Sequence, residues 1–393
     1  MDTRSSSRGN PPRAVDLRRV RAPRIEIVAC ATYDFLLSIH VALHALTTEP
    51  HEFDISDDWV RAAVAKCAAR DPRAIETLGR YVGDGRPSSL QAGFISLIER
   101  CPGPKTVPVF IDWLATIPAF EFAEELLDQD GFSSDWTTLL RQALAEPATM
   151  TNAPGPATLR LLEEMPGEAQ PAAKRVLMEV EVVRAEVIDA LRAWYETVFA
   201  AEEARIMPLL QREAAEMEQR RAASSLEDFI EREMHGVRWQ QPLGVRRYIF
   251  APSVFCPPAV FMRFWRGALT FCTPVRQESQ ADERPAADPH APDEEMVRFF
   301  TALADVTRLR ILRLLLDREM YLTELADRLA LRKATIKHHM VRLRAAGLVF
   351  LYVRKPMTFY ALRPDTPERA RRWLADYLRD PRHSDAESGQ ADS

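Results

Sequence analysis

The chain has 393 residues, of which 47% are hydrophobic, so it is long enough for two or three packed globular domains. A formal net charge of −5 argues against a protein that coats nucleic acid along its whole surface. No run of roughly 18 apolar residues occurs, and the arginine- and serine-rich first residues have no apolar core. We therefore expect no membrane span, no secretory signal and a cytoplasmic protein.

The five cysteines are scattered singly through the chain, without CxxC spacing. An odd number of isolated cysteines, in a protein for which no secretory signal is expected, predicts reduced thiols that lie mostly in the core rather than disulfides. His40 and His44 have the spacing of a two-histidine metal pair on a helix, but no further ligand stands at a fixed distance from them. We therefore predict neither metal ligands nor a cofactor.

Residues 24–275 predict one large, mostly helical N-terminal domain between a disordered polar tail at 1–23 and a Pro-rich flexible linker at 276–292. It begins with RIEIV, in which alternating apolar residues predict a strand, and it continues as a series of helices separated by Pro and Gly. Residues 245–275 return to strand-forming residues. Together with the strand at Arg24 they are expected to form a small sheet against the helices.

The longest stretch of helix-forming sequence runs from residue 171 to residue 235, with Pro208 as a kink or as the start of a new helix. Its apolar residues step by three and four, which gives a seam able to meet another helix of the same chain or of a second copy. The seam consists of Val176, Val180, Val183, Val187, Leu191, Trp194 and Val198.

The motifs of several common enzyme classes are absent: the chain has no GxGxxG or GxxxxGK[ST] phosphate loop, no HExxH and no GxSxG elbow. Adjacent carboxylates such as Glu124 and Glu125 are expected to be solvated on helix surfaces. We therefore predict no catalytic residues and no enzyme. The N-terminal domain is expected to bind a small-molecule effector or only to dimerise, and a catalytic domain remains the alternative.

Residues 293–380, which precede a polar tail at 381–393, hold the order of elements that indicates a function. LADVTRLRILRLLLD predicts a helix with Asp305 and Thr307 near its start. TELADRL predicts a second helix capped by Thr323, and KATIKHHMVRLRAAG predicts a third that ends at Gly347. The apolar stripe of the first helix is expected to contain Leu309, Ile311, Leu312, Leu315 and Leu316.

The third predicted helix has an apolar inner face and a basic outer face, which is the layout of a helix-turn-helix recognition helix. LVFLYV and TFYAL then predict a β-hairpin with two cations at its tip, a wing that can lie along the phosphate backbone. The inner face consists of Ile336, His339, Met340 and Leu343, and the outer face of Lys333, Ala334, Lys337, His338 and Val341.

These four motifs together, between residues 303 and 363, resemble the ArsR-type winged-helix transcriptional regulators. The resemblance implies a homodimer that sets its third helix into the major groove of double-stranded DNA, usually to repress transcription. The expected fold class is mainly α with small β elements: a large, mostly helical N-terminal domain with a small sheet, plus a C-terminal winged helix-turn-helix.

Three residues depart from the family pattern. Val306 stands where Pro often follows the Asp, Ala330 where the turn tends to have Gly, and Arg332 where a Ser caps the recognition helix. Loss of a Ser-type cap costs about 1 kcal/mol, and a non-Gly residue in a left-handed turn costs about as much. The segment EMYLTEL, where metal-sensing members carry cysteines, has none, so no metal sensor is predicted.

Positive charge is concentrated in the C-terminal domain: residues 291–380 contain 18 Arg and Lys but 12 Asp and Glu. We expect DNA rather than another protein to be its partner, because the outer face of the third helix is basic; a protein-docking winged helix is the alternative. The predicted DNA contacts are Lys333, Thr335, Lys337 and His338 in the major groove, Arg332 and Arg342 on phosphates, and Arg354 and Lys355 from the wing.

Overall fold

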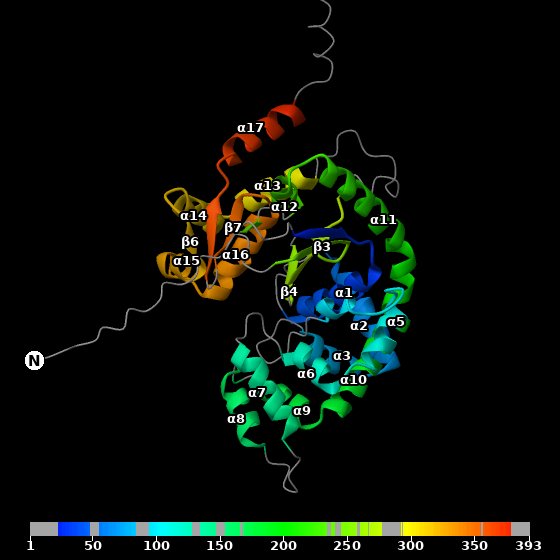
Figure 1. Ribbon diagram of the computed structural model, residues 1–393. Coiled ribbons are helices and arrows are strands. Elements are labelled where there is room, and N and C mark those ends of the chain that lie inside the picture. The colour runs from blue at the N-terminus through cyan, green and yellow to red at the C-terminus, as the bar shows by residue number, and fades with distance from the viewer. Residues whose placement is uncertain are drawn as a thin grey trace, which may run out of the picture.

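The computed structural model describes residues 23–47, 55–83, 94–127, 134–146, 154–165, 167, 169–233, 237–239, 245–257, 260–265, 267–276, 292, 294–354 and 357–378. The predicted C-terminal tail, all of the predicted N-terminal tail except residue 23, nearly all of the predicted linker, and Lys355 lie outside these residues. Helices surround a small sheet in the N-terminal part, and a winged helix-turn-helix follows (Figure 1). The predicted fold class is therefore confirmed.

Helices make up most of the N-terminal part. They are α1 (Ala31–Thr47), α2 (Asp57–Arg70), α3 (Ala74–Leu78), η2 (Gly79–Gly83), α4 (Ile95–Ile98), α5 (Val107–Leu114), α6 (Ala119–Leu127), α7 (Ser134–Ala145), α8 (Pro156–Glu163), α9 (Gln170–Met178), α10 (Val180–Trp194), η3 (Tyr195–Phe199), α11 (Ala200–Ala222) and α12 (Leu226–Glu233). Pro208 lies inside α11 rather than at the start of a helix.

The seam of α10 packs within its own chain. Val183, Val187, Leu191 and Trp194 are all fully buried in the largest apolar core, together with most of α1. The indole N–H of Trp194 also donates to Ser38 Oγ of α1, at 3.0 Å. The seam is therefore part of the intrachain core, and of its seven residues only Val180 is not buried and could contact a second copy.

The predicted small sheet is present, with strand order β1-β3-β5-β4. Strands β1 (Arg24–Ile27), β3 (Arg247–Ser253) and β5 (Ala268–Pro274) run parallel, and β4 (Phe261–Trp265) is antiparallel to β5. β3 and β5 are buried almost without interruption, as is typical of parallel strands covered on both faces. The core around α1 includes side chains of β3 and β5, and α11 and α12 contribute to a second core that contains Phe250 and Phe271.

Asp34 of α1 lies completely buried against the end of β3. Its Oδ1 accepts hydrogen bonds from Ser253 Oγ (2.5 Å) and from the backbone N–H groups of Val254 (3.1 Å) and Phe255 (3.2 Å). Its Oδ2 is buried without a hydrogen-bond partner in the described part of the chain. Burial raises the pKa of Asp34 to about 7, because it outweighs the three hydrogen bonds, which lower the pKa.

The winged helix-turn-helix has its own apolar core. Its elements are α13 (Glu294–Leu303), α14 (Val306–Leu315), β6 (Met320–Tyr321), α15 (Leu322–Leu329), α16 (Lys333–Ala345), β7 (Val349–Arg354), β8 (Met357–Leu362) and α17 (Thr366–Tyr377). β7 and β8 form the predicted hairpin, and β6 pairs with the other edge of β8. Asp305 caps α14 as predicted, because its side chain accepts from the backbone N–H of Arg308.

One strand links the two predicted domains. β2 (Val237–Trp239), which follows α12 in the N-terminal part, pairs in parallel with β7 and gives the wing sheet the order β2-β7-β8-β6. Leu351 of β7 is buried in the same apolar cluster as Phe229 of α12 and Phe250 of β3. The wing is thus joined to the N-terminal part by main-chain pairing and by apolar packing.

Two details of the predicted helices in the winged domain were wrong. Leu309 and Leu316 are 49% and 60% exposed, whereas Ile311, Leu312 and Leu315 are buried. Successive residues of a helix are rotated by about 100° around its axis. This rotation places both Leu309 and Leu316 at about 100° from the centre of the buried stripe. Thr323 does not cap α15, because the helix begins one residue earlier, at Leu322, and its N-cap residue Tyr321 makes no side-chain cap.

The expectation for the acidic pair of α6 was also wrong. Glu124 and Glu125 are buried, and Ser96 Oγ donates to Glu125 Oε2 at 2.6 Å. The expectation for the cysteines was right, since all five are buried free thiols. Among the described residues, no helix is long and apolar enough to cross a membrane.

Candidate nucleic-acid interface

The turn between α15 and α16 sets the angle of the recognition helix. Ala330 ends α15 in the left-handed conformation, with φ 55° and ψ 42°, and it is the only non-glycine residue with positive φ in the described part of the chain. Its N–H donates back to Asp327 O, and Leu331 N–H donates to Ala326 O. The turn therefore has the geometry of a glycine C-cap although an alanine occupies it.

Ala330→Gly is expected to stabilise the protein by about 1 kcal/mol. A β-carbon is strained at this φ, and the strain relieved exceeds the extra backbone entropy that glycine brings to the unfolded chain. Chemical denaturation measures the difference, with Ala65→Gly at an exposed position in the interior of α2 as the control, where destabilisation of about 1 kcal/mol is expected. A loss of stability on Ala330→Gly would contradict the strained turn.

The inner face of α16 consists of packed apolar side chains and one histidine. Ile336, Met340 and Leu343 are buried, as predicted from their spacing. His339 lies under the helix with its Nδ1 3.8 Å from Asp305 Oδ1. Burial lowers the pKa of His339, the nearby Arg308 lowers it further, and Asp305 opposes this. The apolar side chains therefore hold the inner face of α16, while His339 Nδ1 lies near Asp305 without a hydrogen-bond partner among the described residues.

Arg308 braces the same corner from the other side. Its guanidinium donates to Ala302 O (2.7 Å) and Thr301 O (3.0 Å), the last carbonyls of α13. Burial raises the pKa of Asp305, but the hydrogen bond from Arg308 N–H and the charges of Arg308 and His339 outweigh it, so the pKa is lowered. Asp305 and Arg308 together thus connect the end of α13 with the start of α14. The sequence indicated the cap but not this brace.

The outer face of α16 presents cations to solvent. Arg332, Lys333, Thr335 and Lys337 are all exposed, and α16 contains no acidic residue. The fifth predicted contact, His338, is half-buried and accepts a hydrogen bond from Arg342 Nε at 3.1 Å. These six residues therefore lie along one stretch of the helix, from its N-cap to its third turn, where phosphates and base edges could be reached.

Arg332 occupies the N-cap position of α16 and forms no side-chain cap. Arg332→Ser is expected to raise stability by about 1 kcal/mol, because a serine oxygen can accept from the free N–H groups of the first turn. The same change is expected to weaken DNA binding if Arg332 contacts a phosphate. In Arg332→Ser, the free energy of unfolding should rise while the affinity for DNA falls, and both are measured on one preparation. Lower stability together with unchanged affinity would contradict both the missing cap and the phosphate contact.

The wing follows from the end of α16. Gly347 adopts a positive φ of 63°, and Leu348 N–H donates to Leu343 O at 2.9 Å, which ends the helix and starts β7. Arg369 of α17 holds this turn by donating to Gly347 O at 2.7 Å. Arg354 is the last residue of β7, opposite Met357, so it lies at the hairpin tip as predicted; Lys355 lies outside the described residues.

The fold and this face together define a winged helix-turn-helix of the DNA-binding kind. Residues 305–349 match the family model of the bacterial regulatory proteins of the arsR family. The C-terminal domain is thus an ArsR-type DNA-binding domain, and the chain is a DNA-binding transcription regulator. Neither the comparison with curated proteins nor that with solved structures gave a match. The family match covers the C-terminal region alone.

No metal centre accompanies this domain in the part of the chain that the structure describes, where no group of three or more His, Cys, Asp or Glu could hold an ion. His40 and His44 share a face of α1 with ring centroids 5.9 Å apart, and the ring of His40 also packs edge-on against Phe261.

Proposed function

We propose that the protein is a homodimeric transcriptional repressor that places α16 of each protomer in the major groove of one operator. The observation that carries this proposal is the exposed, acid-free outer face of α16 on an ArsR-type domain. Lys333, Thr335, Lys337 and His338 would contact base edges or phosphates. Arg332 and Arg342 would contact phosphates, with Arg354 and Lys355 beside them in the wing.

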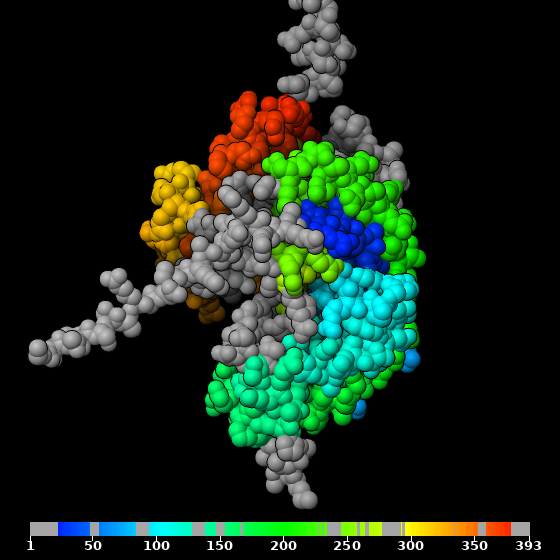
Figure 2. All heavy atoms as spheres, viewed as in Figure 1, coloured from blue at the N-terminus to red at the C-terminus, as the bar shows by residue number. Residues whose placement is uncertain are grey.

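Exposed apolar side chains on α13 and α17 support dimerisation. Leu374 and Tyr377 of α17 and Val297 of α13 are each between 44% and 46% exposed. α17 lies at the surface of the winged domain, as Figure 2 shows, and none of its residues is buried. A twofold interface would cover such apolar residues and would set two recognition helices one helical turn of DNA apart.

The N-terminal part would serve regulation rather than catalysis. We assign it dimer orientation or the binding of a small-molecule effector, because ligands bind among apolar and aromatic side chains with few polar groups, and this part of the chain is rich in such side chains. An effector would show itself as a ligand-dependent change in operator affinity, and the operator would change the affinity for the effector by the same factor.

Lys337→Ala is expected to weaken binding to an operator duplex by about 1–3 kcal/mol if Lys337 contacts a base. Lys66→Ala is the matched control, since Lys66 is also an exposed lysine on a helix but lies on α2. Fluorescence anisotropy at fixed salt measures both. Equal affinities of Lys337→Ala and the unchanged protein would exclude Lys337 from the interface.

A further inference from the structure

The winged domain is attached to the N-terminal part at two places. The first place is the covalent connection after β5, where Arg276 is the last described residue of the N-terminal part. The second is β2, which pairs with β7 and adds a fourth strand to the wing sheet. The register pairs Val237 with Leu351 and Trp239 with Val353. Because the strands are parallel, β2 runs toward the tip of the wing.

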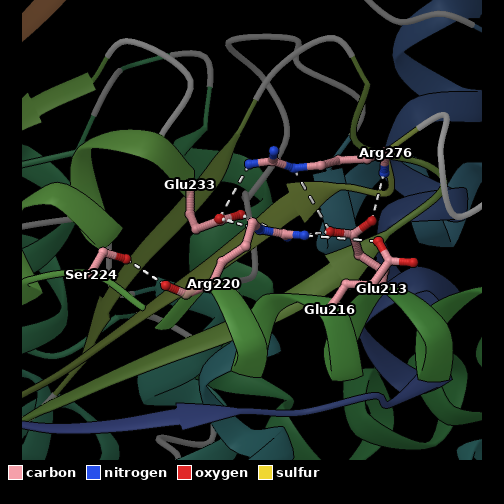
Figure 3. Close-up of polar contacts among 6 residues, drawn as sticks. All are labelled: Glu213, Glu216, Arg220, Ser224, Glu233 and Arg276. Atoms are coloured by element: carbon pink, nitrogen blue, oxygen red, sulfur yellow. Dashed lines mark hydrogen bonds and ion pairs between the residues drawn. The ribbon is translucent and has the colours of Figure 1, made fainter. Parts of the chain in front are cut away.

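A buried charge cluster fixes the elements at both places (Figure 3). The anchor cluster consists of Glu213 and Arg220 of α11, Glu233 at the end of α12, and Arg276. Arg220 donates to Glu213 Oε1 at 2.5 Å and to Glu233 Oε1 at 2.8 Å. Arg276 donates its backbone N–H to Glu213 Oε2 at 2.9 Å and its guanidinium to Glu233 Oε1 at 3.2 Å.

The anchor cluster is close to β2 in the chain and is itself out of water. Glu213 is fully buried and Glu233 is 1% exposed, and the two arginines compensate the charge of both carboxylates. Glu233 precedes Val237, the first residue of β2, by four positions. Movement of α12 would therefore reach β2 directly.

Apolar packing joins the wing to the same elements. Leu351 of β7 is buried in the same apolar cluster as Phe229 of α12, Phe250 of β3 and Met217 of α11. The rings of Phe229 and Phe250 pack edge to face, with centroids 5.0 Å apart. α11 and α12 thus support the wing through β2 and through Leu351.

This attachment leaves the recognition helix accessible. Lys333, Thr335 and Lys337 remain exposed while β2 is paired with β7. The attachment therefore does not mask the basic face; it restricts how that face can be oriented. Two recognition helices must match half-sites separated by about 34 Å, so a restricted orientation lowers the entropy lost on binding.

We propose that β2, held by the anchor cluster, is the positioning strand through which the N-terminal part fixes the orientation of the DNA-binding domain. This role rests on the proposed function, because it requires that the winged domain binds an operator. It also gives a route for regulation: any ligand that shifts α11 against α12 changes the operator affinity through β2 and the wing.

The test uses the full chain and proline substitutions in β2, each with an alanine control. Successive N–H groups of a strand point to opposite sides, so either Arg238 or Trp239 directs its N–H at β7. Arg238→Pro and Trp239→Pro remove these donors, whereas Arg238→Ala and Trp239→Ala lose the same side chains but keep the donors. Differences within each pair therefore report on the backbone of β2 and not on its side chains.

Two quantities are measured on each variant. Within β7 residues 351–353, hydrogen exchange of the amides that point at β2 rather than at β8 should become at least 10-fold faster in one proline variant than in its alanine control, while the amides of α1 keep their protection. Affinity for a labelled duplex of the DNA upstream of the protein's own gene should fall 5- to 50-fold in the same variant. The dependence of the affinity on salt should keep its slope, because the phosphate contacts are unchanged.

The anchor cluster is tested by Glu233→Gln, with Glu216→Gln as the control. Glu216 lies at the exposed margin of the cluster, 3.9 Å from Arg220, with 37% of its side chain exposed. Exchange in β7 should rise 3- to 10-fold in Glu233→Gln and should not change in Glu216→Gln. Equal exchange in these two variants would remove the anchor cluster from the proposal.

The remaining outcomes separate this role from DNA binding itself. Unchanged β7 exchange in both proline variants would overturn the pairing, and faster exchange with the affinity of the alanine control would overturn the positioning role. Failure of the unchanged protein to bind the duplex would overturn the proposed function and the positioning role with it. The exchange measurement would even then report whether β2 holds the wing.

Discussion

Replacing Arg220 with methionine is expected to lower the free energy of unfolding by about 3–5 kcal/mol. The guanidinium is the shared partner of two buried carboxylates, Glu213 and Glu233, and methionine fills a similar volume without charge. Arg276 would then be the one cation of the anchor cluster left to compensate both carboxylates. The measurement is chemical denaturation at neutral pH.

The control is the corresponding substitution in a solvent-exposed ion pair. Arg371 and Glu368 of α17 are both largely exposed, at 71% and 63%, so Arg371→Met should change stability by less than about 0.5 kcal/mol. The double variant Arg220→Met with Glu233→Gln should lose less than the sum of the two single variants, because it leaves one buried carboxylate fewer. A loss under about 1 kcal/mol for Arg220→Met would contradict a buried, tightly coupled cluster.

Asp34→Asn is expected to stabilise the protein increasingly as pH rises from about 4 to about 7. Burial raises the pKa of Asp34 from its ordinary value of 3.8 to about 7, so the folded state keeps the proton over a range where the unfolded state has lost it. A group whose pKa is higher in the folded state than in the unfolded state contributes stability that is fully present below its unfolded-state pKa. This stability is lost as pH rises through its folded-state pKa. At about 1.4 kcal/mol for each pKa unit, the loss reaches about 4 kcal/mol.

Asparagine at position 34 removes the pH dependence of stability that Asp34 causes and keeps an Oδ1 atom as the hydrogen-bond acceptor. Its Oδ1 can accept from Ser253 Oγ and from the N–H groups of Val254 and Phe255, as the carboxyl group of Asp34 does. The difference in unfolding free energy between Asp34→Asn and the unchanged protein should be small at pH 4, should grow up to pH 7 and should be constant above it. A difference that is the same at pH 5 and pH 8 would show that Asp34 does not titrate in this range.

Local patterns were sufficient to predict the winged domain. Ile336, Met340 and Leu343 are buried because helical spacing puts them on one side, and Ala330 is left-handed because it stands where the turn needs a glycine-like φ. The edges of an apolar stripe could not be predicted, as Leu309 and Leu316 show. Apolar residues that lie about 100° around the helix from the centre of the stripe are buried only if a neighbouring element covers them.

Contacts between distant residues could not be predicted. Glu233 and Arg276 lie 43 positions apart, and a charged residue in helix-forming sequence normally predicts a solvated surface. β2 is three residues long and has no pattern of its own; its pairing with β7 depends on where α12 ends. Asp34 did carry a signal, because it is a single acid within an apolar helix, but the turn that binds it is formed by residues more than 200 positions away.

The central claim is that this face of α16 binds duplex DNA, and it is tested most directly by the salt dependence of that binding. The full-length protein is titrated against a labelled duplex of its own upstream region between about 50 and 200 mM salt. We predict that binding weakens steeply as salt rises, and that Lys333→Ala with Lys337→Ala lowers affinity and reduces the slope of log K against log salt by about one for each lost phosphate contact. Absence of binding at the lowest salt, or binding that salt does not change, would contradict the claim.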